Sequence, residues 1–274
     1  MPLNEMAITF RIFISCLFGL ALPLANGDAT PTEPERKAGE RMLLAIHDVE
    51  YPFRWCPPGT FMMGSPESEQ GRSRNERQHQ VKLTRGFWLL ETEVTQTMWE
   101  SVMRSNPSIF KGPKLPVEKV SWNNVQGYLQ RLNDLRVSPP GYRFSLPTEA
   151  QWEYACRAGT TTAFHFGETL NVNQANFLGS KIARTTEVGS YPANAWGLHD
   201  MHGNVWELCS DRHGTYPTES VTDPTGPSSG DFRMFRGGAW DFNAEDCRSA
   251  SRDNDGPSLM YSVLGFRLAL VRAE

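Results

Sequence analysis

Glycine and proline interrupt the chain almost every ten residues from Trp55 onward, and this spacing limits what the chain can form. The sequence has 23 glycines, 19 prolines and 8 tryptophans among 274 residues. Because proline ends helices and glycine favours turns, we expect no long helix after residue 158. A fold made of loops and short strands needs bound cations, disulfides or buried tryptophans to hold it. We expect Trp152, Trp206 and Trp240 to be buried, with each indole N–H bonded to an acceptor.

Hydrophobic periodicity predicts three helices before that point. They cover residues 95–104, 121–135 and 147–157. In the third, Thr148 and Gln151 have the spacing of a capping box. A short helix is also expected at 41–50. Strands are expected at residues 60–63, 87–92, 233–236 and 265–271.

The N-terminus has the layout of a secretory signal peptide. An apolar run, Ile12–Leu24, follows the basic residue Arg11 and precedes small residues before a cleavage site after Gly27. The run is too short to cross a membrane comfortably. We therefore predict a signal peptide at 1–27 and a secreted or periplasmic protein without a membrane segment after cleavage. A buried helix and a lipoprotein anchored at Cys16 are the alternatives.

The rest of the chain divides into a linker and one domain. Residues 28–40 are polar and contain proline, so we expect a linker over 28–50 and a single domain over 51–274. The net charge is −4 and no basic stripe is visible, which argues against nucleic acid as the main partner. The sequence indicates no oligomeric state.

Five ordered motifs run through the expected domain. They read PGTFMMGS at 58–65, ETEVT at 91–95, LPTEAQWEYA at 146–155, GLHDMHGNVWE at 197–207, and RGGAW at 236–240 followed by LGFR at 264–267. With these motifs, the chain from about residue 53 to 272 resembles the formylglycine-generating enzyme (sulfatase-modifying factor) family. The resemblance implies an α+β fold, a single compact domain with little regular secondary structure that is related to C-type-lectin-like domains.

The resemblance also implies an oxidase that converts a cysteine of a protein or peptide substrate to formylglycine with copper and molecular oxygen. In that family two cysteines, five residues apart, follow a Gly-Gly-Ser, and two thiolates suit copper(I) because ligand and ion are both soft. Counting forward from Gly238 places Phe242 and Cys247 at these positions. Counting back from Arg267 puts Ala244 at the second position. Both alignments lack the first cysteine, so we do not expect a bis-thiolate copper site.

Two classes of function remain open on the sequence. One is an exported, oxidase-like member of the family whose copper-binding cysteine pair is not intact. The other, slightly favoured by the residues, is a calcium-stabilised binding or interaction domain without catalysis. An iron-dependent oxygenase would need a ligand set that we cannot assemble from the six scattered histidines, His47, His79, His165, His199, His202 and His213.

The segment from Asp200 to Glu207 has the composition of a calcium loop. Calcium prefers carboxylates and backbone carbonyls on a sharply curved loop. Asp200 and Glu207 supply carboxylates. Gly203 allows the turn, and its carbonyl and that of Val205 can point inward. These four positions also match the family's calcium loop, so we predict a structural calcium ion there, with a solvated turn as the alternative. A second family site would begin at Asn176, but the stretch that follows has no acid.

Four cysteines follow the predicted signal peptide, namely Cys56, Cys156, Cys209 and Cys247. In an exported protein this number is compatible with two disulfides, and the pairing Cys209–Cys247 with Cys56–Cys156 is one of three connectivities. Cys247 could instead be a reactive thiol, although a disulfide or a buried apolar thiol is more common.

The remaining polar residues have structural interpretations. His199 and His202 could bind a transition metal with Asp200, but a turn residue and a buried imidazole are favoured because no further ligands are visible. The charged residues between Trp240 and Phe266 are expected to form a surface with salt bridges rather than a polar cleft. They are Asp241, Glu245, Asp246, Arg248, Arg252, Asp253 and Asp255.

Overall fold

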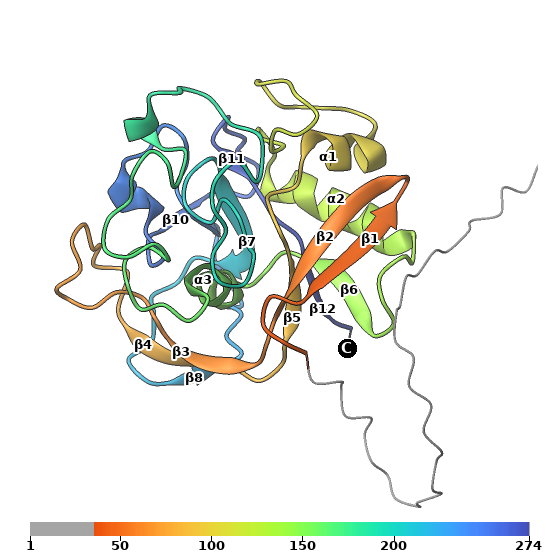
Figure 1. The fold of residues 1–274 in the computed structure, drawn as a ribbon. Coiled ribbons are helices and arrows are strands. Elements are labelled where there is room, and N and C mark those ends of the chain that lie inside the picture. The colour runs from red at the N-terminus through yellow and green to blue at the C-terminus, as the bar shows by residue number, and fades with distance from the viewer. Residues whose placement is uncertain (1–35, 274) are drawn as a thin grey trace, which may run out of the picture. The chain divides into compact units, whose positions relative to one another are not determined.

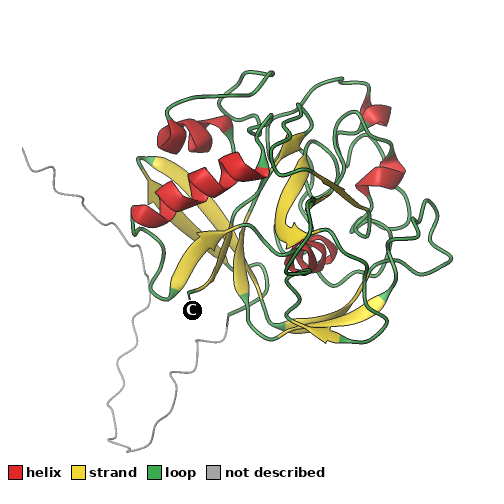
Figure 2. Ribbon diagram, turned by 180° about the vertical axis from the view of Figure 1, so that it is seen from behind, coloured by secondary structure: helices red, strands yellow, loops and turns green. Residues whose placement is uncertain are grey.

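Three small β-sheets and three α-helices make up most of the regular structure in residues 36–273, the part of the chain that the computed structural model describes (Figure 1). Long loops join these elements (Figure 2). The predicted α+β fold with little regular secondary structure is confirmed. The predicted signal peptide at 1–27 lies outside the described residues. No helix within 36–273 has the length and apolar character needed to cross a membrane.

The largest sheet has five antiparallel strands in the order β1-β2-β5-β12-β6. Its strands are β1 (Arg41–Ile46), β2 (Val49–Cys56), β5 (Phe87–Leu90), β12 (Ala269–Arg272) and β6 (Tyr142–Ser145). Helix α1 (Gln96–Met103) packs against β2, and helix α2 (Trp122–Asp134) packs against α1 and β6. The two helices and the sheet share a hydrophobic cluster, in which Trp99 of α1 stacks on Tyr128 of α2 with ring centroids 5.1 Å apart.

Two smaller sheets carry the segments that form the candidate sites. One has the order β10-β9-β7-β11, with β11 parallel to β7. Its strands are β10 (Arg252–Asp255), β9 (Arg233–Arg236), β7 (Trp206–Arg212) and β11 (Leu264–Gly265). The other has the order β3-β4-β8, with strands β3 (Gly59–Met63), β4 (His79–Leu83) and β8 (Val221–Thr222). Helix α3 (Glu149–Arg157) packs against β3, β7 and β9, so it joins these two sheets.

All three predicted helices form, and side chains cap their N-termini. The N-caps of α1, α2 and α3 are Thr95, Ser121 and Thr148. The predicted capping box of α3 is present, because the Thr148 hydroxyl accepts from the Gln151 N–H at 3.1 Å and the Gln151 side chain accepts from the Thr148 N–H at 2.9 Å. These bonds satisfy backbone donors that have no partner inside the helix. Two short 3-10 helices, η1 (Leu178–Ser180) and η2 (Ala244–Cys247), follow later.

The prediction of a helix at 41–50 is wrong, and these residues belong to the sheet rather than to a linker. β1 and β2 form a hairpin at the edge of the five-stranded sheet. His47 and Asp48 occupy the turn with φ values of 50° and 62°, which suit a two-residue hairpin turn. Buried and partly exposed side chains alternate along β2, where Tyr51 and Phe53 are fully buried. This period of two marks a strand, but in a segment this short it is difficult to tell from a helical period.

The strand predicted at 265–271 is split between two sheets. β11 pairs with β7, whereas β12 pairs with β5 and β6. Phe266, Arg267 and Leu268 connect the two strands and are fully buried. The other predicted strands form as β3, β5 and β9.

Two of the three tryptophans find the predicted hydrogen-bond acceptor. Trp152 is fully buried and donates to Glu207 Oε2 at 2.6 Å. Trp240 is half-buried and donates to a backbone carbonyl at 3.3 Å. The prediction is wrong for the third, because the buried indole N–H of Trp206 has no acceptor among the described residues. Its ring instead packs edge-on against Phe235, with centroids 5.3 Å apart.

Candidate functional site

Neither position of the family's cysteine pair carries a thiol that a metal can reach. Phe242 packs its ring edge-on against Trp206, with centroids 5.4 Å apart. Cys247 is fully buried at the end of η2. Burial and the neighbouring charge of Asp246 raise the pKa of the Cys247 thiol above its usual range. Ala244, the second position in the other alignment, has no ligand atom in its side chain.

The sulfur of Cys247 also lacks partners for a metal site. The four cysteines among the described residues are free and buried, so the disulfide pairing considered from the sequence is wrong. His202 approaches Cys247, but its Nδ1 binds the Cys247 carbonyl oxygen at 2.7 Å rather than the sulfur. Within residues 36–273, no three His, Cys, Asp or Glu side chains lie close enough to hold a metal ion together. The residues present therefore do not fit a bis-thiolate copper centre.

The two candidate histidines are occupied by backbone groups. His202 is 1% exposed, and its Nε2 accepts from the His165 N–H at 3.2 Å. Burial and the neighbouring His165 lower the pKa of the His202 imidazole, which keeps the ring neutral. The Nδ1 of His199 binds the Tyr191 carbonyl at 2.7 Å. The interpretation of His202 as a buried imidazole is confirmed, whereas His199 lies in an irregular segment after the turn at 195–196.

The predicted calcium residues Asp200 and Glu207 differ in how their carboxylates are bound. Asp200 Oδ2 accepts from the Gly189 N–H at 2.5 Å, whereas Asp200 Oδ1 is buried and has no hydrogen-bond partner among the described residues. Arg267 holds both oxygens of Glu207, at 2.5 Å each, and Trp152 donates to one of them. Asp200 thus has a free ligand atom, while those of Glu207 are shared with an arginine.

Gly203 provides the curvature that a calcium loop requires. Its φ is 85°, and a Cβ added there would lie 2.2 Å from the Asn176 carbonyl oxygen. Val205, two residues later, is fully buried. The Asn176 side chain, where a second calcium site would begin, donates to the Arg184 carbonyl at 2.8 Å and accepts from the Ser180 hydroxyl at 2.9 Å. Protein groups therefore occupy that position.

A third carboxyl group, that of Glu93, interacts electrostatically with Asp200 and Glu207, although the three are not close enough to hold one metal ion together. Glu93 of the ETEVT motif is fully buried; its Oε1 accepts from Asn204 at 2.9 Å, and its Oε2 has no partner among the described residues. Burial and the charges of Asp200 and Glu207 raise the pKa of Glu93 well above its usual range. Burial also raises the pKa of Asp200 to about 6. Glu93, Asp200 and Glu207 form what we term the acid cluster, and Arg267 balances only part of its negative charge.

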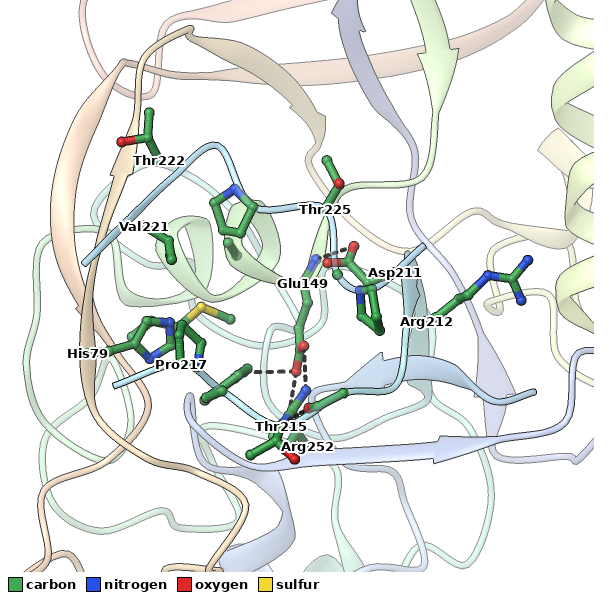
Figure 3. Close-up of a pocket in the computed structure, with 17 residues that line it drawn as sticks. His79, Glu149, Asp211, Arg212, Thr215, Pro217, Val221, Thr222, Thr225 and Arg252 are labelled. Atoms are coloured by element: carbon green, nitrogen blue, oxygen red, sulfur yellow. Dashed lines mark hydrogen bonds and ion pairs between the residues drawn. The ribbon is translucent and has the colours of Figure 1, made fainter. Parts of the chain in front are cut away.

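A cavity of about 500 Å³ lies near the other end of β7 (Figure 3). Residues of β3, β4, β7, β8, β10, the start of α3 and the loop at 214–227 line it. Much of the wall is apolar and includes Met63, Ala150, Pro217, Val221, Pro224 and Pro227. This volume lies within the range of small-molecule binding sites.

An ion pair forms the polar floor of the cavity. Arg252 donates from Nε and Nη2 to the two oxygens of Glu149, at 2.8 and 2.7 Å. The Tyr216 hydroxyl also donates to Glu149, at 2.9 Å. The expectation of a charged surface is wrong for Arg252 and for Arg248, which is buried in a pair with Glu76. Both arginines turn inward because a buried carboxylate accepts two bonds from each guanidinium.

Asp211 lies beside this ion pair. Its Oδ2 accepts from the Glu149 N–H at 2.9 Å and from the Ser210 hydroxyl at 3.0 Å. Asp211 is 3% exposed, and burial together with the charge of Glu149 raises its pKa to about 7. No sequence pattern marks this residue, because a single acid near a strand end has no distinctive spacing.

Most of the chain is similar in sequence or in structure to known proteins. Residues 53–272 match the family model of the sulfatase-modifying factor enzyme 1-like domain. The chain is 40% identical over 161 residues to serine/threonine-protein kinase pkn1 of Chlamydia caviae, covering 57% of this chain and 24% of the kinase. It is 32% identical over 209 residues to the formylglycine-generating enzyme of Mus musculus, covering 70% and 53%. Treponema denticola variable protein 1 has a similar structure, with a TM-score of 0.76 and 28% identity over 84% of this chain and 98% of that protein.

These matches differ in how much of each relative they include. The matched region spans about a quarter of the kinase and about half of the mouse enzyme. All five motifs noted in the sequence lie inside the matched residues. Because the family model covers most of the chain, this protein belongs to the formylglycine-generating enzyme (sulfatase-modifying factor) family.

Proposed function

We propose that this chain is an exported, calcium-stabilised binding domain that keeps the scaffold of its family without the copper chemistry. The observation that carries the proposal is the state of the two cysteine positions. Phe242 packs on the hydrophobic core, and Cys247 is a buried thiol among apolar side chains. Copper(I) needs thiolates that can approach it, and a neutral, enclosed thiol is a poor ligand. Export is supported by the signal-peptide layout of residues 1–27.

The relatives and the cavity add support for a binding function. A segment similar to this chain makes up about a quarter of a chlamydial protein kinase, so the scaffold also occurs in proteins named for another activity. The cavity beside α3 has the size of a small-molecule site and mostly apolar walls. A binding domain requires such walls but no reactive thiol.

Oxygen consumption tests the absence of copper chemistry directly. With copper and a cysteine-containing sulfatase peptide, we expect the purified chain to consume no more oxygen than the same mixture without protein. A family oxidase with an intact cysteine pair serves as the positive control. Turnover by the wild-type chain that disappears in Cys247→Ser would refute the proposal, because it would make the buried thiol part of a catalytic centre.

The acid cluster supports the calcium part of the proposal. Asp200 Oδ1 and Glu93 Oε2 are buried acceptors without partners, and such atoms are costly unless a donor or a cation meets them. A divalent ion would balance the negative charge that Arg267 leaves. The residues that would hold it are Asp200, Gly203, Val205 and Glu207, with Glu207 shared between the ion and Arg267. Calcium would act structurally there, by fixing the loop that leads into β7.

Calcium is therefore expected to raise the midpoint of thermal unfolding. A ligand at a hundred times its dissociation constant stabilises the folded state by about 2.7 kcal/mol, which corresponds to roughly 5–10 °C in a domain of this size. The midpoint of thermal unfolding is measured by circular dichroism, once in calcium and once in EDTA, and the two midpoints are compared. Asp200→Ala should abolish the difference, and Glu219→Ala, at an exposed position, should retain it. Identical midpoints for the wild-type chain would contradict the calcium assignment.

A further inference from the structure

We propose that the cavity beside Asp211 binds a small primary ammonium compound with an apolar body. This inference rests on the binding function proposed above and assigns its ligand class. It stands on the side chains that line the cavity, on the hydrogen-bond capacity that they leave free, and on the balance of charge at the floor (Figure 3).

The charged donors at the floor are already used within the protein. Arg252 directs Nε and Nη2 to Glu149, and its Nη1 donates to the Gly214 carbonyl at 2.9 Å. The Tyr216 hydroxyl also donates to Glu149. Arg212 extends away from the cavity in Figure 3. An anionic ligand would therefore have to displace an existing ion pair to be recognised.

Besides the threonine hydroxyls, which can donate or accept, Asp211 and His79 offer acceptor atoms at the cavity that the protein leaves free. The bonds made by Asp211 all involve Oδ2, so Oδ1 has no hydrogen-bond partner within residues 36–273, although the side chain is 97% buried (3% exposed). His79 is 4% exposed, and its Nδ1 donates to the Arg77 carbonyl at 3.0 Å, which leaves Nε2 as an acceptor. An acceptor that borders a cavity and has no protein donor is available to a donor on a bound ligand. The cavity is thus matched to a ligand that donates hydrogen bonds.

The charge of Asp211 favours a cationic donor over a neutral one. Arg252 is committed to Glu149, so an ionised Asp211 has no arginine bound to it. Burial and the charge of Glu149 raise the pKa of Asp211 to about 7. An ammonium group at Oδ1 would replace the proton and form a charge-assisted hydrogen bond. The apolar wall, which includes Val221 and Pro217, would enclose a hydrocarbon or aromatic body.

Binding is expected to strengthen between pH 6 and pH 8, because ammonium and proton compete for the Asp211 carboxylate. The charged and titratable groups around it, from α3, β4, β7, β9, β10 and the loop after β7, are Glu149, His79, Arg212, Arg233, Arg252 and Tyr216. The arginines keep their charge in this range. Burial raises the pKa of Tyr216 well above it. A change of affinity between pH 6 and pH 8 that comes from Asp211 should therefore disappear in Asp211→Asn.

The proposal is tested by titrating the full chain with 2-phenylethylamine in a calorimeter, which measures the heat of binding. Two matched probes keep a similar body and change the head group: 2-phenylethanol is a neutral donor and 3-phenylpropionate is an anion. We expect the amine to bind at one site about tenfold to a hundredfold more tightly than either. Asp211→Asn should reduce amine affinity to that of the alcohol. Asp231→Asn, an exposed acid outside the cavity, changes net charge equally and should bind as the wild type does.

Equal binding of the amine and the alcohol, or no saturable binding of the amine to the wild-type chain, would overturn the proposal. The probe series and its pH dependence use the wild-type chain, so they decide the matter even if Asp211→Asn is unstable. Copper-dependent oxygen turnover would refute the proposed binding function while leaving a measured amine site in place. Failure of amine binding alone would overturn only the ligand class.

Discussion

Replacing Arg267 by methionine is expected to destabilise the protein by about 3–5 kcal/mol, because it leaves buried carboxylates without their arginine. The guanidinium is fully buried, binds both oxygens of Glu207, and donates to the His199 carbonyl at 3.0 Å. Methionine keeps much of the volume of the side chain but none of its charge. The acid cluster would then hold three carboxyl groups with no guanidinium beside them. Urea unfolding at pH 7, followed by tryptophan fluorescence, measures the change.

Arg143→Met is the matched control for this variant. Arg143 is exposed on β6, so its replacement should change the free energy of unfolding by no more than about 0.5 kcal/mol. Calcium should restore part of the stability lost in Arg267→Met if the ion occupies the acid cluster, since it supplies positive charge at the same place. A loss below about 1 kcal/mol in Arg267→Met would show that Arg267 is not the cation on which the cluster depends.

Gly203→Ala is expected to cost at least about 2–4 kcal/mol, because it combines backbone strain with a collision. The φ of 85° disfavours any side chain, and the added Cβ would lie 2.2 Å from the Asn176 carbonyl oxygen. That carbonyl cannot withdraw freely, because it accepts from the Asn204 N–H at 2.7 Å. The loop that carries Asp200 would therefore have to move. Thermal and urea unfolding both report the loss.

Gly127→Ala is the opposite case in the same chain. Gly127 lies inside α2, and a Cβ added there would have no atom within 4 Å. Alanine in a helix interior is more favourable than glycine, so this change should stabilise the protein by about 0.5–1 kcal/mol. If both glycine variants changed stability in the same direction, the conformational explanation for Gly203 would be wrong.

The elements that sequence reasoning predicted well are those whose signals are local. Helix α3 has its capping residues three positions apart, and β9 is a short run of four residues with the apolar Met234 and Phe235 at its centre. The hairpin β1–β2 was missed because its signal is the pairing of two short strands across a turn, which periodicity in one segment does not reveal. The strand predicted at 265–271 failed for a related reason, since each half pairs with a different sheet.

The candidate sites were predictable only in part. The motif from Asp200 to Glu207 identified a loop rich in oxygen ligands, and the calcium ion itself stays a prediction. The partners of that loop, Glu93 and Arg267, lie in other motifs far along the chain, and no spacing rule joins them. Asp211 gave no signal, because its raised pKa depends on burial beside Glu149, which lies 62 residues away in the sequence.

By itself, the sequence determined the family, the three capped helices and the loss of the first cysteine of the copper pair, because each depends on residue types at short spacings. Only the tertiary structure decided that Cys247 is buried and unpaired, that Arg267 faces an acid cluster, and that Asp211 borders a cavity with a free acceptor. The physical reason is that burial, pKa and unused hydrogen-bond capacity depend on atoms brought together from distant parts of the chain.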